Sequence, residues 1–229
     1  NRGCIPKKLY SYSAHFLEEI QIMKSFGWSV NGVKFSWSKL VKNKKIELER
    51  LNKIYEGLLK KSGVEIFKFW AKFIDNKTIK LSNNSIIKAK KILIAVGGEP
   101  IIPKISGSKY FLTSNEIFDV KKLPKSIMIL GGGYIAIEFA SIFNGLGGDT
   151  TLCLRGDKVL RGFDTEVVDF LVNEMKKKGV KFIINSSPRK IEKKNNKLIV
   201  EFDTKKKKFD VILAAIGRKT NIDKLAIHN

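Results

Sequence analysis

At residues 126–140 the chain reads SIMILGGGYIAIEFA, an apolar run of strand length followed by three glycines and a second apolar run. Residues 127–130 predict a strand. The spacing of Gly131, Gly133 and Ala136 between that strand and a helix is typical of a dinucleotide-binding turn. Glycines allow a close approach to a pyrophosphate, which the N–H groups at the helix start attract. A structural turn without a ligand is the alternative, but the full context favours a Rossmann-like nucleotide site.

The residues after the second strand of this domain distinguish two dinucleotides. Residues 150–154 predict that strand, and Arg155 and Arg161 follow it. NAD sites hold the ribose hydroxyls with an acidic residue near this strand end, whereas guanidinium groups suit a 2′-phosphate. Asp157 is the candidate acid, but it lies past the strand end. The pattern therefore favours NADPH over NADH.

Strands and helices continue to alternate after the glycine-rich turn. Asp164 can cap a helix that ends at Gly179. Further strands are expected at residues 181–184 and 209–214, with a hairpin turn at residues 195–196. This alternation predicts a doubly wound α/β domain.

Two helices and several short strands are expected before this domain. Pro6 suits the first turn of one helix, and a second helix is predicted at residues 40–59. The glycine- and proline-containing segment 97–103 predicts a domain boundary. The predicted strands of this half are residues 64–69, 78–81, 85–89 and 91–96.

The formal net charge of +22 makes nucleic-acid binding a class to weigh. Six of the 44 basic residues are arginines, and the lysines are spread along the whole chain. Proteins that read bases rely on arginine for bidentate contacts to guanine. A solvated, lysine-rich surface is therefore the favoured interpretation, and nucleic acid is not an expected partner.

Apolar runs and cysteines indicate the compartment. The longest apolar run, residues 211–216, has the length of a strand rather than of a membrane span. Cys4 and Cys153 are far apart and do not form a disulfide scaffold. The first residues contain no long apolar stretch of a secretory signal. We therefore expect a cytoplasmic protein, with neither a membrane partner nor a metal site.

Three segments resemble a known family. Residues 1–8 read NRGCIPKK, residues 132–140 read GGYIAIEFA and residues 214–218 read AAIGR. Together with Arg155 and Arg161, they resemble the flavin-dependent pyridine nucleotide disulfide reductases. Within that family, the segments are most similar to the branch that reduces glutathione disulfide. The similarity covers essentially all 229 residues and keeps the family's order.

The resemblance implies two α/β domains of the Rossmann-like type, the first of them incomplete. Residues 1–97 would be the C-terminal part of an FAD-binding domain, residues 98–218 an NADPH-binding domain and residues 219–229 the start of a central domain. The implied cofactors are FAD and NADPH, and the implied substrate is glutathione disulfide. A homodimer is implied for the full-length protein.

The resemblance also implies roles for individual residues. Cys4 matches the cysteine that faces the flavin, as a thiolate favoured by a helix start and nearby cations. Lys7 and Glu138 match a pair that meets beside the flavin ring. Tyr134 matches an aromatic lid over the flavin, and Tyr55 matches a tyrosine that contacts glutathione. From the residues alone, an inert cysteine, ordinary helix-surface charges and a core tyrosine remain alternatives.

Cofactor contacts are implied on two sides. The residues on the FAD side are Gly3, Lys7, Ala71, Gly97 and Arg218. The residues on the NADPH side are Gly131, Gly132, Gly133, Tyr134, Ile135, Ala136, Glu138, Arg155, Arg161 and Gly217. The chain departs from the family pattern at Phe69, Val96 and Thr220, which affects the FAD side more than the NADPH side.

Several other functions stay open. Arg155 and Arg161 argue against the NAD-using dihydrolipoamide dehydrogenase, whereas trypanothione reductase and mercuric reductase are sister enzymes that fit the same segments. A stand-alone NADPH-binding module and a basic nucleic-acid-binding protein are alternatives of other classes.

The resemblance places several parts of the catalytic apparatus outside these residues. They are the first cysteine, the FAD fingerprint and the dimerisation domain with its His–Glu pair, onto which neither His15 nor His228 maps. Disulfide exchange needs two sulfur atoms, an attacking and a resolving one. We therefore expect the 229 residues alone to be inactive as a disulfide reductase and the full-length protein to be active.

Overall fold

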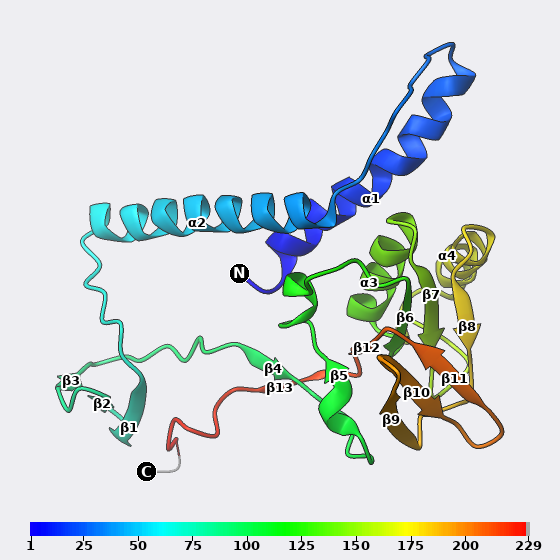
Figure 1. Ribbon diagram of the computed structural model, residues 1–229. Helices are drawn as coiled ribbons and strands as arrows, with labels where there is room; N and C mark the ends of the chain where they lie inside the picture. Colours follow the sequence, from blue (N-terminus) through cyan, green and yellow to red (C-terminus); the bar gives the residue numbers. More distant parts are fainter. Residues whose placement is uncertain (228–229) are drawn as a thin grey trace. The chain divides into compact units, whose positions relative to one another are not determined.

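A computed structural model of the protein describes residues 1–227 and contains two compact units (Figure 1). Unit 1 combines residues 1–48 with residues 100–217, and unit 2 combines residues 49–99 with the C-terminal residues from 218 onward. The expected α/β fold with a parallel sheet is confirmed. His228, which matched no catalytic residue, lies outside the described residues.

A five-stranded parallel sheet organises unit 1. Its order is β5 (Phe111–Leu112), β12 (Val211–Ala214), β6 (Ser126–Leu130), β7 (Asp149–Cys153) and β8 (Lys181–Ile183). The chain runs from β6 through β7 to β8 in one direction and places β12 on the other side of β6. The strand order therefore changes direction beside β6, at the position where α/β sheets bind ligands outside the carboxyl ends of their strands.

Helices connect the parallel strands. α3 (Tyr134–Gly145) follows β6, and α4 (Thr165–Lys177) follows β7. Asp164 caps α4 as expected, because its carboxylate accepts a hydrogen bond from the Val167 N–H at 3.0 Å. Gly179 ends the helix in the left-handed region, with φ +95°.

An antiparallel meander is inserted before β12. It consists of β9 (Lys190–Lys194), β10 (Lys197–Glu201) and β11 (Lys206–Phe209). The expected hairpin turn between β9 and β10 is confirmed. Asn195 and Asn196 both adopt positive φ, 50° and 59°, which asparagine tolerates better than most residues.

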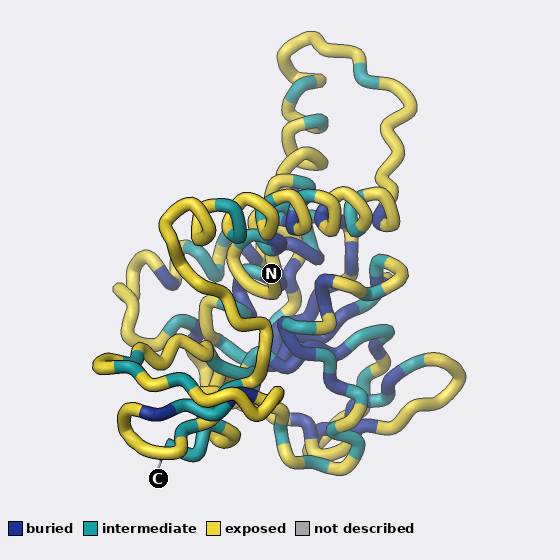
Figure 2. The backbone as a smooth tube through the Cα atoms, turned by 90° about the vertical axis from the view of Figure 1, so that its left-hand side faces the viewer, coloured by how far each residue is buried: buried dark blue, intermediate teal, exposed yellow. Residues whose placement is uncertain are grey.

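Alternate residues of β6 pack into different cores. Ile127 and Ile129 join the cluster formed with the helices, whereas Met128 and Leu130 join the cluster formed with the meander. This alternation follows from the two-residue period of a strand whose two faces are both covered. Figure 2 shows the buried residues gathered in this sheet and in α3.

Two long helices precede the sheet in the chain. α1 (Cys4–Ser25) packs against α3 in unit 1. α2 (Trp37–Lys61) starts in unit 1 and ends in unit 2. The far end of α1 and residues 26–36 are largely exposed (Figure 2).

Three side chains from these helices hold one stretch of backbone. The Tyr10 hydroxyl donates to the Phe118 carbonyl at 2.7 Å, and Lys44 Nζ donates to the same oxygen at 3.0 Å. Trp37 Nε1 donates to the Val120 carbonyl at 2.7 Å. Because Tyr10 and Lys44 are almost fully buried, these bonds satisfy polar groups that water cannot reach. The short 3₁₀ helix they hold, η2 (Ile117–Asp119), lies just before β6 in the chain.

Unit 2 contains the second half of α2, and the strands in its described part are short. β1 (Ala71–Asp75), β2 (Thr78–Leu81) and β3 (Ile86–Lys88) form an antiparallel sheet in chain order. A second sheet pairs β4 (Gly98–Pro100) with β13 (Arg218–Thr220). The 3₁₀ helix η1 (Ser108–Tyr110) belongs to unit 1.

Some of the expected strands are wrong. Residues 64–69 and 91–96 form no strand, and Leu93 is 90% exposed. Both segments have the apolar composition of strands, but a strand needs a hydrogen-bonded neighbour, and the described residues offer none to them. Residues 209–214 form the end of β11 and all of β12 rather than one strand. Asp210 separates the two, because its carboxylate accepts from the Ser126 N–H at 3.0 Å.

The two compact units are not the expected domains, whose bounds at residues 97 and 218 stay a prediction. Residues 1–48, expected in the same domain as residues 49–97, cluster with the parallel sheet instead. The chain passes from unit 2 to unit 1 after residue 99 and back to unit 2 after residue 217. The assignment of FAD and NADPH to particular domains stays a prediction.

The buried hydroxyl of Tyr10 provides a test of unit 1. Burial raises the pKa of this phenol above its ordinary value, so the group stays a protonated donor to Phe118. Tyr10→Phe should lower the free energy of unfolding by about 1–2 kcal/mol, because it leaves a buried carbonyl with one donor fewer. Tyr12→Phe, on the same helix but 53% exposed, is the matched control and should change little. Equal midpoints for the two variants in urea unfolding would contradict this account.

Candidate functional site: the carboxyl edge of the parallel sheet

The glycine-rich turn follows β6, and neighbouring backbone atoms lie very close to its first residue, Gly131. Gly131 has φ +136°, and its N–H donates to the Cys153 carbonyl at 2.9 Å. A Cβ atom at Gly131 would lie 2.2 Å from the Ala215 carbonyl oxygen, which no side chain tolerates. The first glycine is therefore required by the packing of the turn itself.

The third glycine faces open space. A Cβ atom at Gly133 would meet no described atom within 4 Å. Gly133 directly precedes α3 and has no side chain with which to cap it. The first N–H groups of the helix are consequently available to an external acceptor, with the positive end of the helix dipole behind them. This geometry suits an anion such as a pyrophosphate.

Residues at the start of α3 differ in exposure. Tyr134 is 61% exposed, Ile135 is half-buried, and Ala136 is fully buried. Ala136 therefore packs α3 closely against its surroundings, which is the role of the third small residue in the fingerprint. The Tyr134 ring is free to contact a bound molecule.

The loop after β7 folds back onto the turn. The Leu160 N–H donates to the Gly132 carbonyl at 2.7 Å, and the neighbouring Val159 is 2% exposed. Arg155 and Arg161, at the two ends of this loop, are both exposed. The structure thus links the segment that carries the two arginines to the glycine-rich turn.

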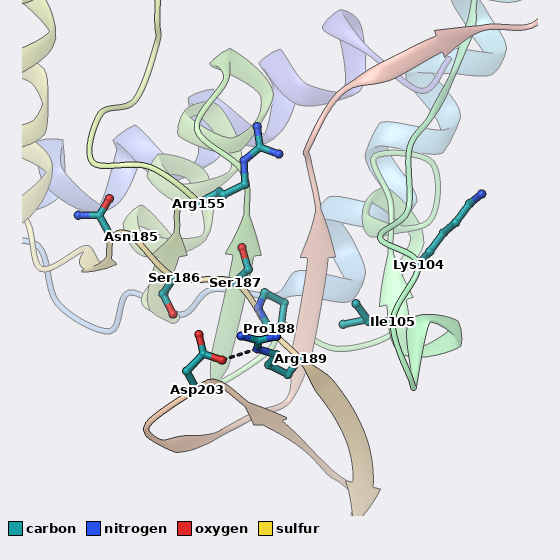
Figure 3. A pocket seen from close by; sticks show the side chains of 9 residues that line it. All are labelled: Lys104, Ile105, Arg155, Asn185, Ser186, Ser187, Pro188, Arg189 and Asp203. Carbon is teal, nitrogen blue, oxygen red and sulfur yellow. Dashed lines mark hydrogen bonds and ion pairs between the residues drawn. The ribbon is translucent and has the colours of Figure 1, made fainter.

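Arg155 also borders a hollow of about 560 Å³ on unit 1 (Figure 3). Figure 3 shows the Arg155 side chain pointing away from Arg189, which is paired with Asp203. The remaining lining residues are Lys104, Ile105, Asn185, Ser186, Ser187 and Pro188. Arg155 is therefore exposed toward solvent rather than held by the acidic residue of this hollow.

Lys7 and Glu138 meet in unit 1. Lys7 Nζ lies 2.5 Å from Glu138 Oε1, and the two side chains are 22% and 37% exposed. Lys7 belongs to the first turn of α1, and Glu138 lies one turn into α3. The packing of α1 on α3 brings them together although 131 residues separate them in the chain.

The two cysteines have contrasting environments. Cys4 is the exposed first residue of α1 and directly follows Gly3. Cys153 is buried at the end of β7, and burial raises the pKa of its thiol to about 12. Cys153 is therefore a structural thiol, and Cys4 is the thiol that a reagent or substrate can reach.

Other expected site residues lie in or next to unit 2. Gly97 has φ +68° and accepts from the Asn221 N–H at 3.1 Å, and Arg218 donates to the Gly98 carbonyl. Ala71 starts β1, and Tyr55 is 52% exposed on α2. Gly217, the last residue of unit 1, has φ +138° and accepts from the Ile101 N–H at 3.0 Å.

Residues 1–227 lack the features of a metal centre and of a membrane-spanning helix. No cluster of three or more histidine, cysteine, aspartate or glutamate side chains there could hold a metal ion. Within the same residues, no helix has both the length and the apolar character needed to cross a membrane.

A family model connects these features. The model for pyridine nucleotide-disulphide oxidoreductases matches residues 1–228. The chain belongs to this family. The resemblance noted from the sequence is thereby confirmed at the level of the family.

Curated relatives match the whole chain. A glutathione reductase of a Nostoc species is 38% identical over 100% of the chain, and the chloroplastic/mitochondrial glutathione reductase of Pisum sativum is 39% identical over 100%. A thioredoxin reductase of Plasmodium falciparum is 36% identical, also over 100% of the chain. The chain covers 50%, 42% and 44% of these three proteins. It therefore spans about half the length of the curated relatives it matches.

A solved structure supports the same fold. The HOCl-induced flavoprotein disulfide reductase RclA from Escherichia coli superposes on 99% of the chain with a TM-score of 0.85 and 26% identity, and the chain covers 49% of that structure. FAD and NADPH are the cofactors of the flavoprotein disulfide reductases in this family. The open space before Gly133 and the uncapped start of α3 fit the pyrophosphate of a dinucleotide.

Two features of the site have no clear signal in the sequence. The Leu160 N–H holds the loop of residues 155–161, the arginine loop, against the glycine-rich turn. Leucine is not a residue type expected at the positive φ that Leu160 adopts. The bonds from Tyr10, Trp37 and Lys44 that fix the α1–α2 pair to residues 118–120 join positions far apart in the chain. The indole N–H of a buried tryptophan needs an acceptor, but the sequence does not show which carbonyl provides it.

The first and third glycines of the turn should respond differently to the same substitution. Gly131→Ala should destabilise the protein by more than about 2 kcal/mol, because its Cβ would collide with the Ala215 carbonyl at a positive φ. Gly133→Ala should leave the free energy of unfolding nearly unchanged but weaken NADPH binding, because its Cβ would occupy the space before the helix. Thermal unfolding and NADPH titration of both variants provide the measurement. Unchanged NADPH affinity in Gly133→Ala would contradict the placement of the pyrophosphate.

Proposed function

We propose that the full-length protein reduces glutathione disulfide with NADPH, through FAD and a redox-active cysteine pair. One observation carries the proposal: the loop with Arg155 and Arg161 is hydrogen-bonded to a glycine-rich turn that opens a helix. The turn that would bind a pyrophosphate and the two arginines that would bind a 2′-phosphate therefore belong to segments joined by a hydrogen bond. Membership of the family supplies the reaction class.

Residues of unit 1 would hold NADPH. The N–H groups at the start of α3 would bind the pyrophosphate, with Gly133 allowing its approach. Arg155 and Arg161 would bind the 2′-phosphate by charge-assisted hydrogen bonds. Gly131, Gly132, Ile135, Ala136 and Gly217 would shape the surface beneath the dinucleotide, and the exposed Tyr134 ring would cover the flavin side until nicotinamide arrives.

Lys7, Glu138 and Cys4 would carry the redox chemistry. When bound, FAD supplies a group that can accept a hydride and pass electrons on to a disulfide. Glu138 would hold Lys7 in place through the 2.5 Å contact, so that the ammonium group offers positive charge to the flavin. Cys4 would be the cysteine of the pair that faces the flavin, since it is exposed at the helix start. Gly3, Ala71, Gly97 and Arg218 would contact FAD.

The names of the relatives indicate two different substrates. Two of the relatives named above are glutathione reductases and one is a thioredoxin reductase. We favour glutathione disulfide, with Tyr55 as a contact, because the glutathione reductases share slightly higher identity with the chain. A homodimer in the cytoplasm is the proposed state of the full-length protein. NADPH-dependent turnover of thioredoxin but not of glutathione disulfide by the full-length protein would favour the other substrate.

The proposed binding of the 2′-phosphate by Arg155 and Arg161, called here the arginine clamp, can be tested directly by measuring the affinity for each dinucleotide. Arg155→Ala and Arg161→Ala should each weaken NADPH binding by about tenfold or more, since a hydrogen bond to a charged group contributes roughly 1.5–3 kcal/mol. NADH affinity should stay within a factor of about two, because NADH has no 2′-phosphate to lose. Fluorescence titration of both dinucleotides measures the two affinities. Lys158→Ala, in the same loop, controls for general loss of positive charge. Equal losses for NADPH and NADH would refute the assigned role.

A further inference from the structure

Leu160 has a backbone conformation that leucine rarely adopts. Its φ is 48°, in the left-handed region that favours glycine and asparagine. A bulky residue there stores strain, and such residues persist only where their surroundings determine the conformation several times over. Strain of this kind is found mainly at functional sites.

Three interactions hold Leu160 in this conformation. Its N–H donates to the Gly132 carbonyl at 2.7 Å, and its own carbonyl accepts from the Phe163 N–H at 3.0 Å. The half-buried Leu160 side chain packs against the hydrophobic cluster that contains the buried Val159. A glycine would adopt the same backbone without strain, but it would lose the apolar anchor and gain freedom in the loop.

The strained residue immediately precedes Arg161. Gly162, the next residue, also has positive φ, +93°, so Arg161 sits between two left-handed positions. The hydrogen bond from the Leu160 N–H to the Gly132 carbonyl thus sets the direction of the backbone at Arg161. Gly132 is itself part of the glycine-rich turn. Rotation of residue 160 into the ordinary right-handed or extended region would redirect Arg161 and break that hydrogen bond.

We propose that Leu160 is a positioning residue for dinucleotide selectivity. Its left-handed backbone, hydrogen-bonded to Gly132, aims Arg161 at the 2′-phosphate. The inference rests on the proposed function, because it presupposes that Arg161 recognises that phosphate. It adds that preference for NADPH over NADH depends on a leucine that itself touches no phosphate.

Substitutions at residue 160 separate backbone conformation from packing. Leu160→Val keeps an apolar anchor but disfavours positive φ, because valine is β-branched. Leu160→Asn gives up the anchor but favours the left-handed region. If the backbone matters, the polar variant should preserve selectivity better than the apolar one, which is the reverse of what a packing role predicts.

The experiment is titration of NADPH and NADH into the protein and its variants Leu160→Val, Leu160→Asn, Arg161→Ala and the double variant Leu160→Val/Arg161→Ala. Leu160→Val should lower NADPH affinity about tenfold and leave NADH affinity unchanged, as expected for loss of one charged hydrogen bond. Leu160→Asn should stay within about threefold of the unmodified protein, since its hydrogen bond to Gly132 is retained. The double variant should match Arg161→Ala, because residues that act through one another are not additive.

The outcomes separate this inference from the proposed function. If Arg161→Ala loses selectivity but Leu160→Val does not, the inference is wrong and the proposed function stands. If Arg161→Ala keeps selectivity, both the inference and the arginine clamp are wrong. A parallel loss of NADPH and NADH affinity in Leu160→Val would mean a structural role only and would overturn the inference. Should circular dichroism show that Leu160→Val is unfolded, Leu160→Ala, which disfavours positive φ less strongly, replaces it with the same expected direction.

Discussion

The close approach of the Gly131 backbone to the Ala215 carbonyl is the constraint on which the candidate site depends. It joins the ends of β6 and β12, the neighbouring parallel strands at which the strand order changes direction. Ala215 continues the ladder, with its N–H donating to the Leu130 carbonyl at 2.8 Å. With the chain held this closely, the turn has to lead directly into α3. The start of the helix is therefore presented at the carboxyl edge of the sheet.

The position of α3 then sets the rest of unit 1. α1 packs against α3, and this contact brings Lys7 to Glu138. The bonds from Tyr10, Trp37 and Lys44 to residues 118–120 fix the two long helices to the segment that leads into β6. The glycine-rich turn and the lysine–glutamate pair are consequently parts of one packed unit, because Glu138 lies one turn into the helix that follows Gly133.

Much of this arrangement could be predicted from the sequence because it depends on local rules. The apolar period of β6, the glycine spacing after it, the Asp164 cap and the Asn195–Asn196 turn each reflect a preference of a few neighbouring residues. The family resemblance added Lys7 and Glu138 as a pair, which spacing alone could not have joined. The sequence predicts one strand at residues 209–214, whereas in the structure β11 ends at Phe209 and β12 begins at Val211.

The remaining features depend on contacts distant in the chain or on energetic compromise. Residues 91–96 look like a strand, but composition cannot reveal whether a neighbouring strand will pair with them. At Leu160 the local preference is clear but is overridden. Leucine disfavours a positive φ, and the surrounding contacts nevertheless hold its backbone there. Positions where local preference fails are where functional constraint is expected, which is why Leu160 became informative only in three dimensions.

Hydrogen–deuterium exchange in the presence and absence of NADPH measures whether the first turn of α3 and the loop of residues 155–161 together hold the dinucleotide. Saturating NADPH should slow exchange at the amides of residues 132–136 and 155–161, while residues 190–209 of the antiparallel meander stay unchanged. NADH should protect the first segment more than the second, because it has no 2′-phosphate. Protection confined to the meander, or none at residues 132–136, would contradict the account.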